Sequence, residues 1–329
     1  MRPFTGGNGW DNMSAELATE VNELLTEYIK DAKLRGKAES TLDTYESYLR
    51  YTFKYLDCHP EELGKSELKD FLHHLQNEKD GRRGNKNGVS GKTIDGYFSA
   101  LSSFYGYLTY EEKLSRNPVS PFQERYLDND TTSGEEERQL ISVSEMAGLV
   151  MSVMKTRDKA IILLFAKTGV RRKELIQIDV QDIDWEQQSI RLKPTAKRTN
   201  QIVFFDDECS RVLKKWLEIR NEAEPETDAL FTNQENERLQ RNGVYSVVTK
   251  HAENIGLHDP DSDRLTDRFT PHCFRHWFTT HLRRSEMKRE YIKELRGDKR
   301  EVDPMETYNH IDREKLRESY LTHIPQLNI

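Results

Sequence analysis

A polar, acidic run in the middle of the chain is the feature that most constrains its fold. The run from Asp128 to Glu137 has no apolar periodicity, and Asn117-Pro-Val-Ser-Pro121 before it is expected to end the helical bundle that precedes it. A chain of 329 residues also exceeds the usual size of one domain. We therefore predict two domains. Their bounds are a mobile tail at 1–13, a first domain at 14–125, a linker at 126–138 and a second domain at 139–329.

The first predicted domain is helical. Apolar residues recur at helical spacing in segments that begin at Ser14, at Ser40 and after Gly64, and in a fourth segment from Ile94 to Leu108. Ser40 is predicted to cap the second helix. Four amphipathic helices in about a hundred residues form a small bundle. Its simplest role is that of a scaffold.

A polar, glycine-rich loop from Lys79 to Gly91 interrupts this bundle. It carries Arg82, Arg83 and Lys86, and Lys92 follows just after it. Cationic side chains beside aromatic-rich helices are candidates for contacts with the phosphates of DNA.

The second predicted domain mixes helices with a hairpin. Helical patterns cover Val143 to Met154 and Arg157 to Lys167, and Thr168-Gly169 ends the second of these. Two extended runs, Ser189–Leu192 and Gln201–Phe205, flank a polar turn and predict a β-hairpin. We expect an α+β protein that is mainly helical, with further helices at 206–220, 243–254, 270–282, 290–296 and 312–320.

Composition limits the class of protein. No apolar run is long enough to span a bilayer, and the N-terminus lacks the apolar core of a signal peptide. Cys58, Cys209 and Cys273 are scattered, without the pairing of a metal site. These features predict a soluble cytoplasmic protein without a structural zinc ion.

The net charge of −7 argues mildly against a nucleic-acid partner. Net charge is only a sum, however, and local basic clusters can oppose it. Such clusters occur at 82–86, 171–173, 193–198 and 283–284.

One of the predicted helices carries a cluster of cationic and imidazole groups. Spacings of three and four residues place His272, Arg275 and His276 on neighbouring positions of a helix surface. Phe274 and Phe278 would form its buried side. A positive cluster at a helix N-terminus suits a phosphate. An ordinary amphipathic helix with a solvated charged face explains the same pattern when it is taken alone.

Two common kinds of site do not occur in the sequence. There is no glycine-rich phosphate loop followed by Lys-Ser or Lys-Thr, which argues against the usual nucleotide-hydrolysing enzymes. No His, Asp and Glu arrangement has convincing metal-ligand spacing. We therefore expect no metal and no cofactor.

Three ordered segments resemble the motifs of the tyrosine recombinases, the phage integrase family. Residues 168–175 (Thr-Gly-Val-Arg-Arg-Lys-Glu-Leu) are similar to the first arginine box, and 272–276 to the second. Residues 291–298 with 307–311 are similar to the closing segment. The resemblance extends over about residues 14 to 325. It implies a helical core-binding domain and an integrase-type catalytic domain, which together form a C-shaped clamp around duplex DNA.

The resemblance also implies the chemistry. Attack of a tyrosine oxygen on a phosphodiester builds negative charge on the non-bridging oxygens, and bidentate guanidinium groups can carry that charge without a metal. This implies Arg171 and Arg275 as the phosphate ligands and His272 as a further donor or proton carrier. Tyr308 would be the nucleophile, which forms a covalent 3′-phosphotyrosyl link. Lys197 in the hairpin turn would protonate the leaving 5′ oxygen, with Lys193 as the other candidate.

Several of these assignments have alternatives. Arg172 competes with Arg171 for the phosphate, and His276 can be a structural neighbour of Arg275. Tyr291 and Tyr320 compete with Tyr308.

Asp298 departs from the family pattern, which usually has His or Trp after Leu-x-Gly. An ionised Asp cannot donate a hydrogen bond and repels a phosphate. Either it orients Arg171 or Arg275, or Lys299 replaces the missing donor, or catalysis is slower.

The function that the resemblance implies is site-specific cleavage and rejoining of double-stranded DNA by a homo-tetramer on two sites. The apolar segment after Tyr308 would pack on a neighbouring protomer, and no membrane or small-molecule substrate is expected. The alternatives are a non-catalytic DNA-binding accessory protein of the same fold and a helical protein-interaction module. One sequence does not reveal the DNA target. Beyond the catalytic set, the predicted DNA contacts are Arg82, Arg83, Lys86, Lys92, Arg172, Lys193 and Arg198.

Overall fold

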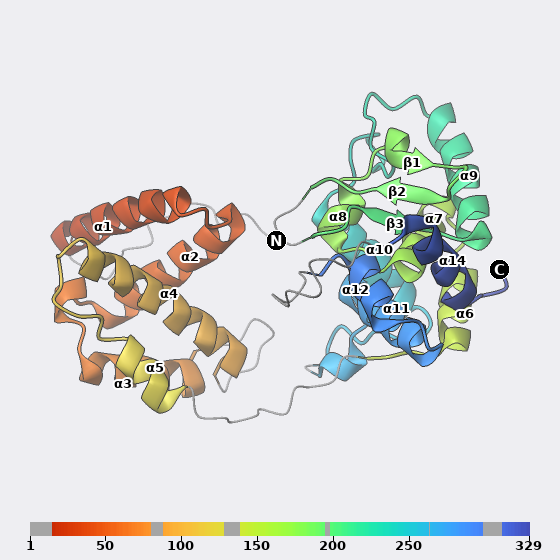
Figure 1. The fold of residues 1–329 in the computed structure, drawn as a ribbon. Helices are drawn as coiled ribbons and strands as arrows, with labels where there is room; N and C mark the ends of the chain where they lie inside the picture. Colours follow the sequence, from red (N-terminus) through yellow and green to blue (C-terminus); the bar gives the residue numbers. More distant parts are fainter. Residues whose placement is uncertain (1–14, 80–87, 128–138, 195–197, 263, 299–310) are drawn as a thin grey trace. The chain divides into compact units, whose positions relative to one another are not determined.

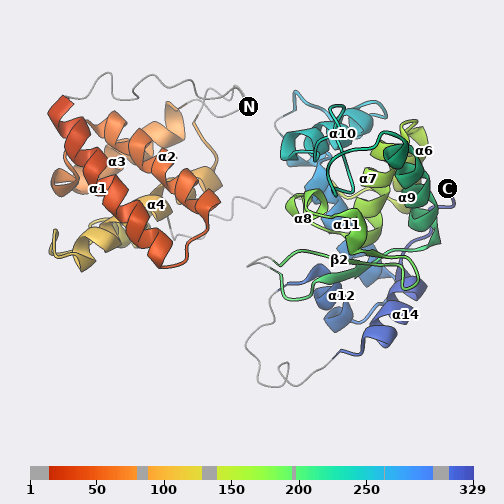
Figure 2. The same cartoon turned by 90° about the horizontal axis from the view of Figure 1, so that it is seen from above.

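The computed structural model describes residues 15–79, 88–127, 139–194, 198–262, 264–298 and 311–329. The chain forms two compact units, Met1–Glu135 and Glu136–Ile329, and each is described here by itself. Figures 1 and 2 show their elements from two directions. Among the described residues, no helix combines the length and the apolar character needed to cross a membrane. The predicted tail at 1–13 lies outside these residues.

The N-terminal unit is a helical bundle around an aromatic core, and its four long predicted helices are confirmed. Tyr28, Phe53 and Phe104 are fully buried, with the rings of Tyr28 and Phe104 edge to face at 5.5 Å between centroids. The elements are α1 (Ala15–Leu34), α2 (Glu39–Leu56), η1 (Pro60–Glu62), α3 (Lys65–Asn77), α4 (Gly91–Tyr110) and α5 (Ser120–Tyr126).

Two local predictions for this unit are wrong. Helix α2 begins at Glu39 with Ala38 at the N-cap position, so Ser40 lies inside the helix. The segment with Pro121 starts the short helix α5, because proline is tolerated in a first turn, where its missing N–H is not needed. Leu127 then packs against the core of the unit, so the packed chain extends into the predicted linker. Residues 128–138 lie outside the described residues.

The C-terminal unit combines helices with a small antiparallel sheet of order β1-β2-β3. The predicted hairpin is confirmed as β2 and β3, in which Ile190 pairs with Val203. Strand β1 is an addition that pairs with β2. The elements are α6 (Val143–Ser152), α7 (Thr156–Thr168), α8 (Arg172–Ile176), η2 (Val180–Asp182), β1 (Ile183–Asp184), β2 (Ser189–Arg191), β3 (Ile202–Phe204), α9 (Asp207–Glu222), α10 (Arg241–Glu253), η3 (Leu265–Asp267), α11 (Pro271–Arg284), α12 (Arg289–Arg296) and α14 (Arg313–His323).

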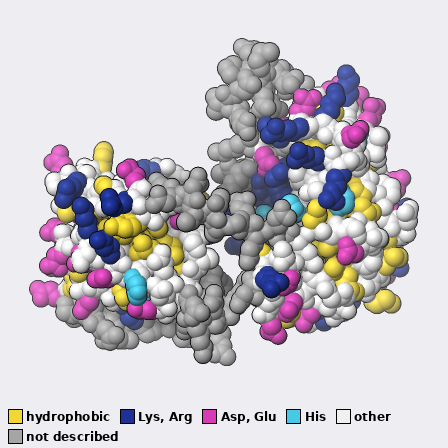
Figure 3. All heavy atoms as spheres, turned by 90° about the horizontal axis from the view of Figure 1, so that it is seen from below, with side chains coloured by type: hydrophobic (Ala, Val, Ile, Leu, Met, Phe, Trp, Pro, Cys, Tyr) yellow, Lys and Arg dark blue, Asp and Glu magenta, His cyan; other side chains and the backbone are white. Residues whose placement is uncertain are grey.

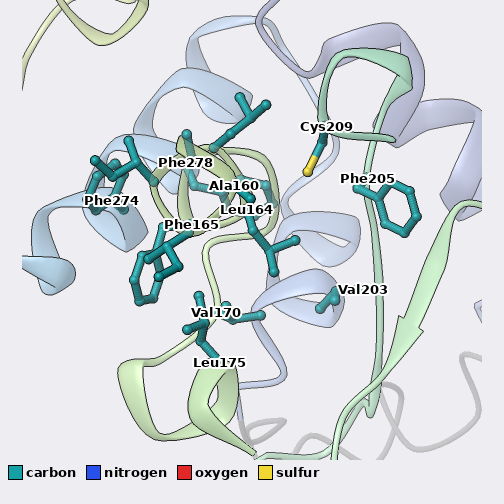
Figure 4. Packing of buried hydrophobic residues seen from close by; sticks show 14 of the residues in the cluster. Ala160, Leu164, Phe165, Val170, Leu175, Val203, Phe205, Cys209, Phe274 and Phe278 are labelled. Carbon is teal, nitrogen blue, oxygen red and sulfur yellow. The ribbon is translucent and has the colours of Figure 1, made fainter. Parts of the chain in front are cut away.

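Helix α7 forms the centre of this unit. Every residue from Ala160 to Thr168 is buried, because the stretch from Ala160 to Ala166 is apolar on all sides and the helix is packed between α9 and α11. The buried Lys167 ammonium is paired with Asp206 and Glu208. Figure 4 shows Phe165 beside Phe274 of α11, and their stacked rings are 5.5 Å apart. Phe278 of α11 is also buried, as predicted. This packing fixes the end of α7 against α11.

The C-terminal segment packs on its own unit, and its packing on a neighbouring protomer stays a prediction. The Tyr320 hydroxyl donates to the carbonyl of Lys167 (2.8 Å), and the buried Lys167 ammonium donates to the carbonyl of Pro325 (2.7 Å). Glu208 accepts from the backbone N–H of Leu327 (2.9 Å). Apolar burial and these hydrogen bonds together tie α14 and the residues after it to α7 and α9.

Candidate functional site

The first part of the site is the turn between α7 and α8. Gly169 ends α7 at φ +58°, and a Cβ there would lie 2.6 Å from the ring of Phe278. This backbone conformation and this close approach both require glycine. The turn places Arg171 at the N-cap position of α8 and directs the carbonyl of Gly169 toward α11.

Arg275 reaches this turn from α11. Its residue surface is only 5% exposed, so a solvated charged face does not describe it. Its guanidinium donates to the carbonyls of Gly169 (3.0 Å) and Arg296 (2.9 Å) and to Asp298 Oδ1 (2.7 Å). Burial, with Arg171 and Arg296 nearby, lowers the pKa of Arg275 to about 10, which leaves it charged at neutral pH.

Arg171 converges on the same carboxylate. Its Nη2 donates to Asp298 Oδ1 (3.3 Å), and its Nη1 donates to Glu174 Oε1 (3.0 Å). The backbone N–H of Arg171 donates to Glu174 Oε2 (2.7 Å). Glu174 is buried, and its two carboxylate oxygens accept from the backbone N–H and from the guanidinium of Arg171. It therefore fixes both the start of α8 and the direction of the Arg171 side chain.

Asp298 is therefore bound by both predicted phosphate ligands. Its Oδ1 accepts from Arg171 and Arg275, and its Oδ2 lies 2.9 Å from Nε of Arg296. Of the three alternatives for this position, the structure supports orientation of the arginines. Lys299 lies outside the described residues.

The burial of Arg198 argues against its predicted contact with DNA. Its side chain is 0% exposed, and its guanidinium donates to Glu174 Oε2 (3.1 Å) and to the carbonyl of Leu295 (2.7 Å). It thus joins the β2–β3 turn to α8 and to the end of α12. Gly297 ends α12 at φ +62°. A Cβ at this position would collide with the Arg198 side chain.

We predict that Gly297→Ala lowers the free energy of unfolding by more than about 1 kcal/mol, because it introduces strain at a positive φ and a steric clash. The lower midpoint would be measured by urea unfolding. Gly148→Ala is the matched control, since Gly148 lies in α6 with open space around its Cα. That change should be neutral or stabilising. Equal midpoints for the two variants would contradict the explanation of Gly297.

The two lysine candidates for the general acid differ in what the structure shows. The Lys193 ammonium lies 3.0 Å from both Asp179 and Asp182, whose hydrogen bonds raise its pKa. Lys197 lies outside the described residues. Thr199, two residues later, donates its N–H to the carbonyl of Gly297 (3.2 Å), so the chain after Lys197 is attached to the site.

The tyrosine candidates also differ. Tyr320 is fully buried and its hydroxyl is hydrogen-bonded to Lys167; burial raises its pKa, so it cannot serve as the nucleophile. Tyr291 is half-buried on α12, with the Lys288 ammonium 5.6 Å from its ring. Tyr308 lies outside the described residues.

The remaining predicted residues lie on surfaces or outside the described residues. His272 and His276 are exposed on α11, and Lys92 is exposed in the first turn of α4. Arg172 is half-buried, with its guanidinium 5.9 Å from the ring of Tyr245. Figure 3 shows Lys and Arg side chains with His beside them on the visible face of the C-terminal unit. Three predicted residues of the N-terminal loop lie outside the described residues: Arg82, Arg83 and Lys86.

Sequence reasoning missed Glu174 and Arg296 at this site. The spacing of Arg171 and Glu174 is that of a capping box, and this signal could have identified Glu174 as a residue that fixes the turn. No comparable signal exists for Arg296.

In the described part of the chain, no cluster of three or more His, Cys, Asp or Glu side chains could hold a metal ion.

Comparison with known proteins identifies the family. Residues 131–315 match the model of the phage integrase family, and residues 24–113 match a phage integrase N-terminal SAM-like domain. Tyrosine recombinase XerD of Listeria monocytogenes is 25% identical over 317 residues, which cover 91% of this chain and 98% of that protein. Tyrosine recombinase XerC of Thermodesulfovibrio yellowstonii is 27% identical, with 92% and 96% covered.

Solved structures show the same fold. The Tn1549 transposon integrase in complex with circular intermediate DNA has a TM-score of 0.62 at 18% identity, over 90% of this chain and 98% of that one. The XerH site-specific recombinase bound to its difH substrate has a TM-score of 0.60 at 19% identity, over 93% and 88%. The family model alone matches more than half of the chain. The chain therefore belongs to the phage integrase family, the tyrosine-type site-specific DNA recombinases.

Proposed function

We propose that this protein cleaves and rejoins duplex DNA by attack of Tyr308 on a phosphodiester, through a covalent 3′-phosphotyrosyl intermediate and without a metal or high-energy cofactor. The observation that carries the proposal is the convergence of Arg171 and Arg275 on a single carboxylate oxygen, Oδ1 of Asp298. Two guanidinium groups that meet at one anionic oxygen are suited to bind a non-bridging phosphate oxygen.

The arginines are held in place before any substrate binds. Arg275 is fixed by two backbone carbonyls and Arg171 by Glu174. Fixed donors stabilise charge that develops in the transition state without the cost of reorganising solvent or side chains. The geometry thus suits a reaction that builds charge on the phosphate.

Two proton-transfer roles complete the proposal. The leaving 5′ oxygen requires a proton, and we propose that the Lys197 ammonium donates it. Lys193 is less suited, because Asp179 and Asp182 hold its ammonium and make it a weaker acid. His272 lies exposed on α11, three residues before Arg275, which supports a role as further donor or proton carrier.

Duplex DNA is the proposed partner, bound by a homo-tetramer on two sites. The named structural relatives are bound to DNA, which supports the first part. The C-terminal segment packs on its own unit, so a tetramer needs either other contacts or release of this segment. Analytical ultracentrifugation of the complex would measure the protein-to-DNA ratio. The proposed contacts, from which Arg198 is removed, are Arg82, Arg83, Lys86, Lys92, Arg172 and Lys193.

The test is a suicide substrate. A binding site would first be selected from a random duplex library and then nicked next to the cleavage position, so that the cut strand cannot be rejoined. The wild type should accumulate a protein–DNA adduct that survives denaturant, also in the presence of a chelator, and Tyr308→Phe should form none.

Three outcomes would change the proposal. An adduct with Tyr308→Phe would show that another residue is the nucleophile. A selected site that binds tightly but forms no adduct would favour a non-catalytic accessory protein. Loss of cleavage in chelator that is restored by a divalent metal would contradict the metal-free mechanism.

A further inference from the structure

Arg296 is a third guanidinium at the site, and the family resemblance assigns it no role. It is the residue between Leu295 and Gly297, at the C-terminal end of α12. Its Nε lies 2.9 Å from Oδ2 of Asp298, the oxygen that Arg171 and Arg275 do not use. One carboxylate therefore contacts three guanidinium groups.

The backbone of Arg296 is held independently of its side chain. Its carbonyl accepts hydrogen bonds from Arg275 (2.9 Å) and from Arg198 (3.1 Å). Its side chain is 33% exposed, and in the described parts of the chain its Nε makes an ion pair with Asp298 but no hydrogen bond. Among the described residues, the contacts that hold this position in the fold are made by the backbone carbonyl, so the partly exposed guanidinium is available to an anion.

The charges at the site favour an anion. Among the described residues, four arginines share two carboxylates, Glu174 and Asp298, through the ion pairs described above. Glu174 is buried between Arg171 and Arg198. Positive charge is therefore in excess around Asp298, at the partly exposed side of the cluster. A phosphate would meet several donors there despite the carboxylate.

We propose that Arg296 is a catalytic residue that binds the scissile phosphate, and that Asp298 is its positioning residue. Asp298 cannot donate to a phosphate, whereas the planar guanidinium of Arg296 can, with two parallel N–H groups. The pair takes the place of the His or Trp donor that the family usually has after Leu-x-Gly. This inference rests on the proposed function and adds a specific ligand to its site.

The test compares two suicide substrates, one with the natural scissile phosphate and one with a methylphosphonate, which lacks a charged non-bridging oxygen. Arg296→Ala should lower single-turnover cleavage of the phosphate about 10²–10³-fold, the loss typical of a removed transition-state donor. Its loss on the methylphosphonate should be at least tenfold smaller, because the charge that Arg296 stabilises is absent. Arg289→Ala, an exposed arginine at the start of the same helix, should keep wild-type rates.

A rescue completes the test. Adding Asp298→His to Arg296→Ala should raise the cleavage rate at least tenfold above that of Arg296→Ala alone, because the imidazole restores a hydrogen-bond donor. Arg296→Met, which keeps the length and bulk of the side chain but has no hydrogen-bond donor, should behave as Arg296→Ala does. If the wild type cleaves, two results overturn this inference alone. Either Arg296→Ala loses the same factor on both substrates, or neither Arg296 variant loses activity. Absence of any wild-type adduct overturns the proposed function and this inference with it.

Discussion

Arg275→Ala is expected to lower the rate of DNA strand cleavage by about 10²–10³-fold or more, with a much smaller effect on DNA binding. The variant removes a buried donor at the proposed phosphate position, and such donors act mainly on the transition state. Binding is spread over many phosphate contacts, so the loss of one should weaken it only modestly. Single-turnover adduct formation and equilibrium binding, measured on the same selected site, separate the two effects.

Two further variants sharpen this expectation. Arg275→Lys keeps the charge but loses the fork that reaches the carbonyl of Gly169 and Asp298 together, so most of the activity should still be lost. Arg283→Ala, an exposed arginine two turns later on α11, is the matched control and should cleave normally. Cleavage by Arg275→Ala within tenfold of the wild-type rate would contradict the proposed role.

Glu174→Ala should be the most destabilising change at the site, at about 3–5 kcal/mol. The carboxylate is buried and accepts from the backbone N–H of Arg171 and from the guanidinium groups of Arg171 and Arg198. Without it the fully buried Arg198 side chain keeps its charge but loses its only carboxylate partner among the described residues. Cleavage should fall as well, because Arg171 loses its fixed direction.

Tryptophan fluorescence during urea unfolding suits this measurement, because Trp185, Trp216 and Trp277 all lie in the C-terminal unit. Glu218→Ala is the control, since Glu218 is exposed on α9, and a surface change of this kind usually alters stability by less than about 0.5 kcal/mol. A Glu174→Ala midpoint equal to that of Glu218→Ala would show that the buried network contributes little to stability.

Most of the fold could be predicted because its helices carry clear apolar periodicity. The pattern in α3 and α4 marks the same residues that the structure buries, among them Phe71 and Phe104. Strand β1 has only two residues, too short for a periodic signal. The position of the C-terminal segment depends on the buried Lys167, whose partners lie far away in the sequence, so no local pattern could predict how the segment packs on its own unit.

The site was predictable as a set of residues but not as a set of contacts. The motifs pointed to Arg171 and Arg275, whereas helical spacing gave only the position of Arg275 on its helix and did not indicate that its guanidinium is buried. Spacing determines where a side chain starts, but a guanidinium on a long stem can turn back to a buried carbonyl. The same limit applies to Arg198, which lies in a basic turn and yet is bonded to Leu295, far along the chain.

The covalent link to Tyr308 is the central claim, and its most direct measurement is the identity of the modified residue. The adduct from the suicide substrate would be digested with protease and nuclease, and the peptide that carries the nucleotide remnant sequenced by mass spectrometry. We predict one modified peptide, with the 3′-phosphate of the cut strand joined to the Tyr308 oxygen. A remnant on Tyr291 or any other residue, or cleaved DNA without a modified peptide, would contradict the account.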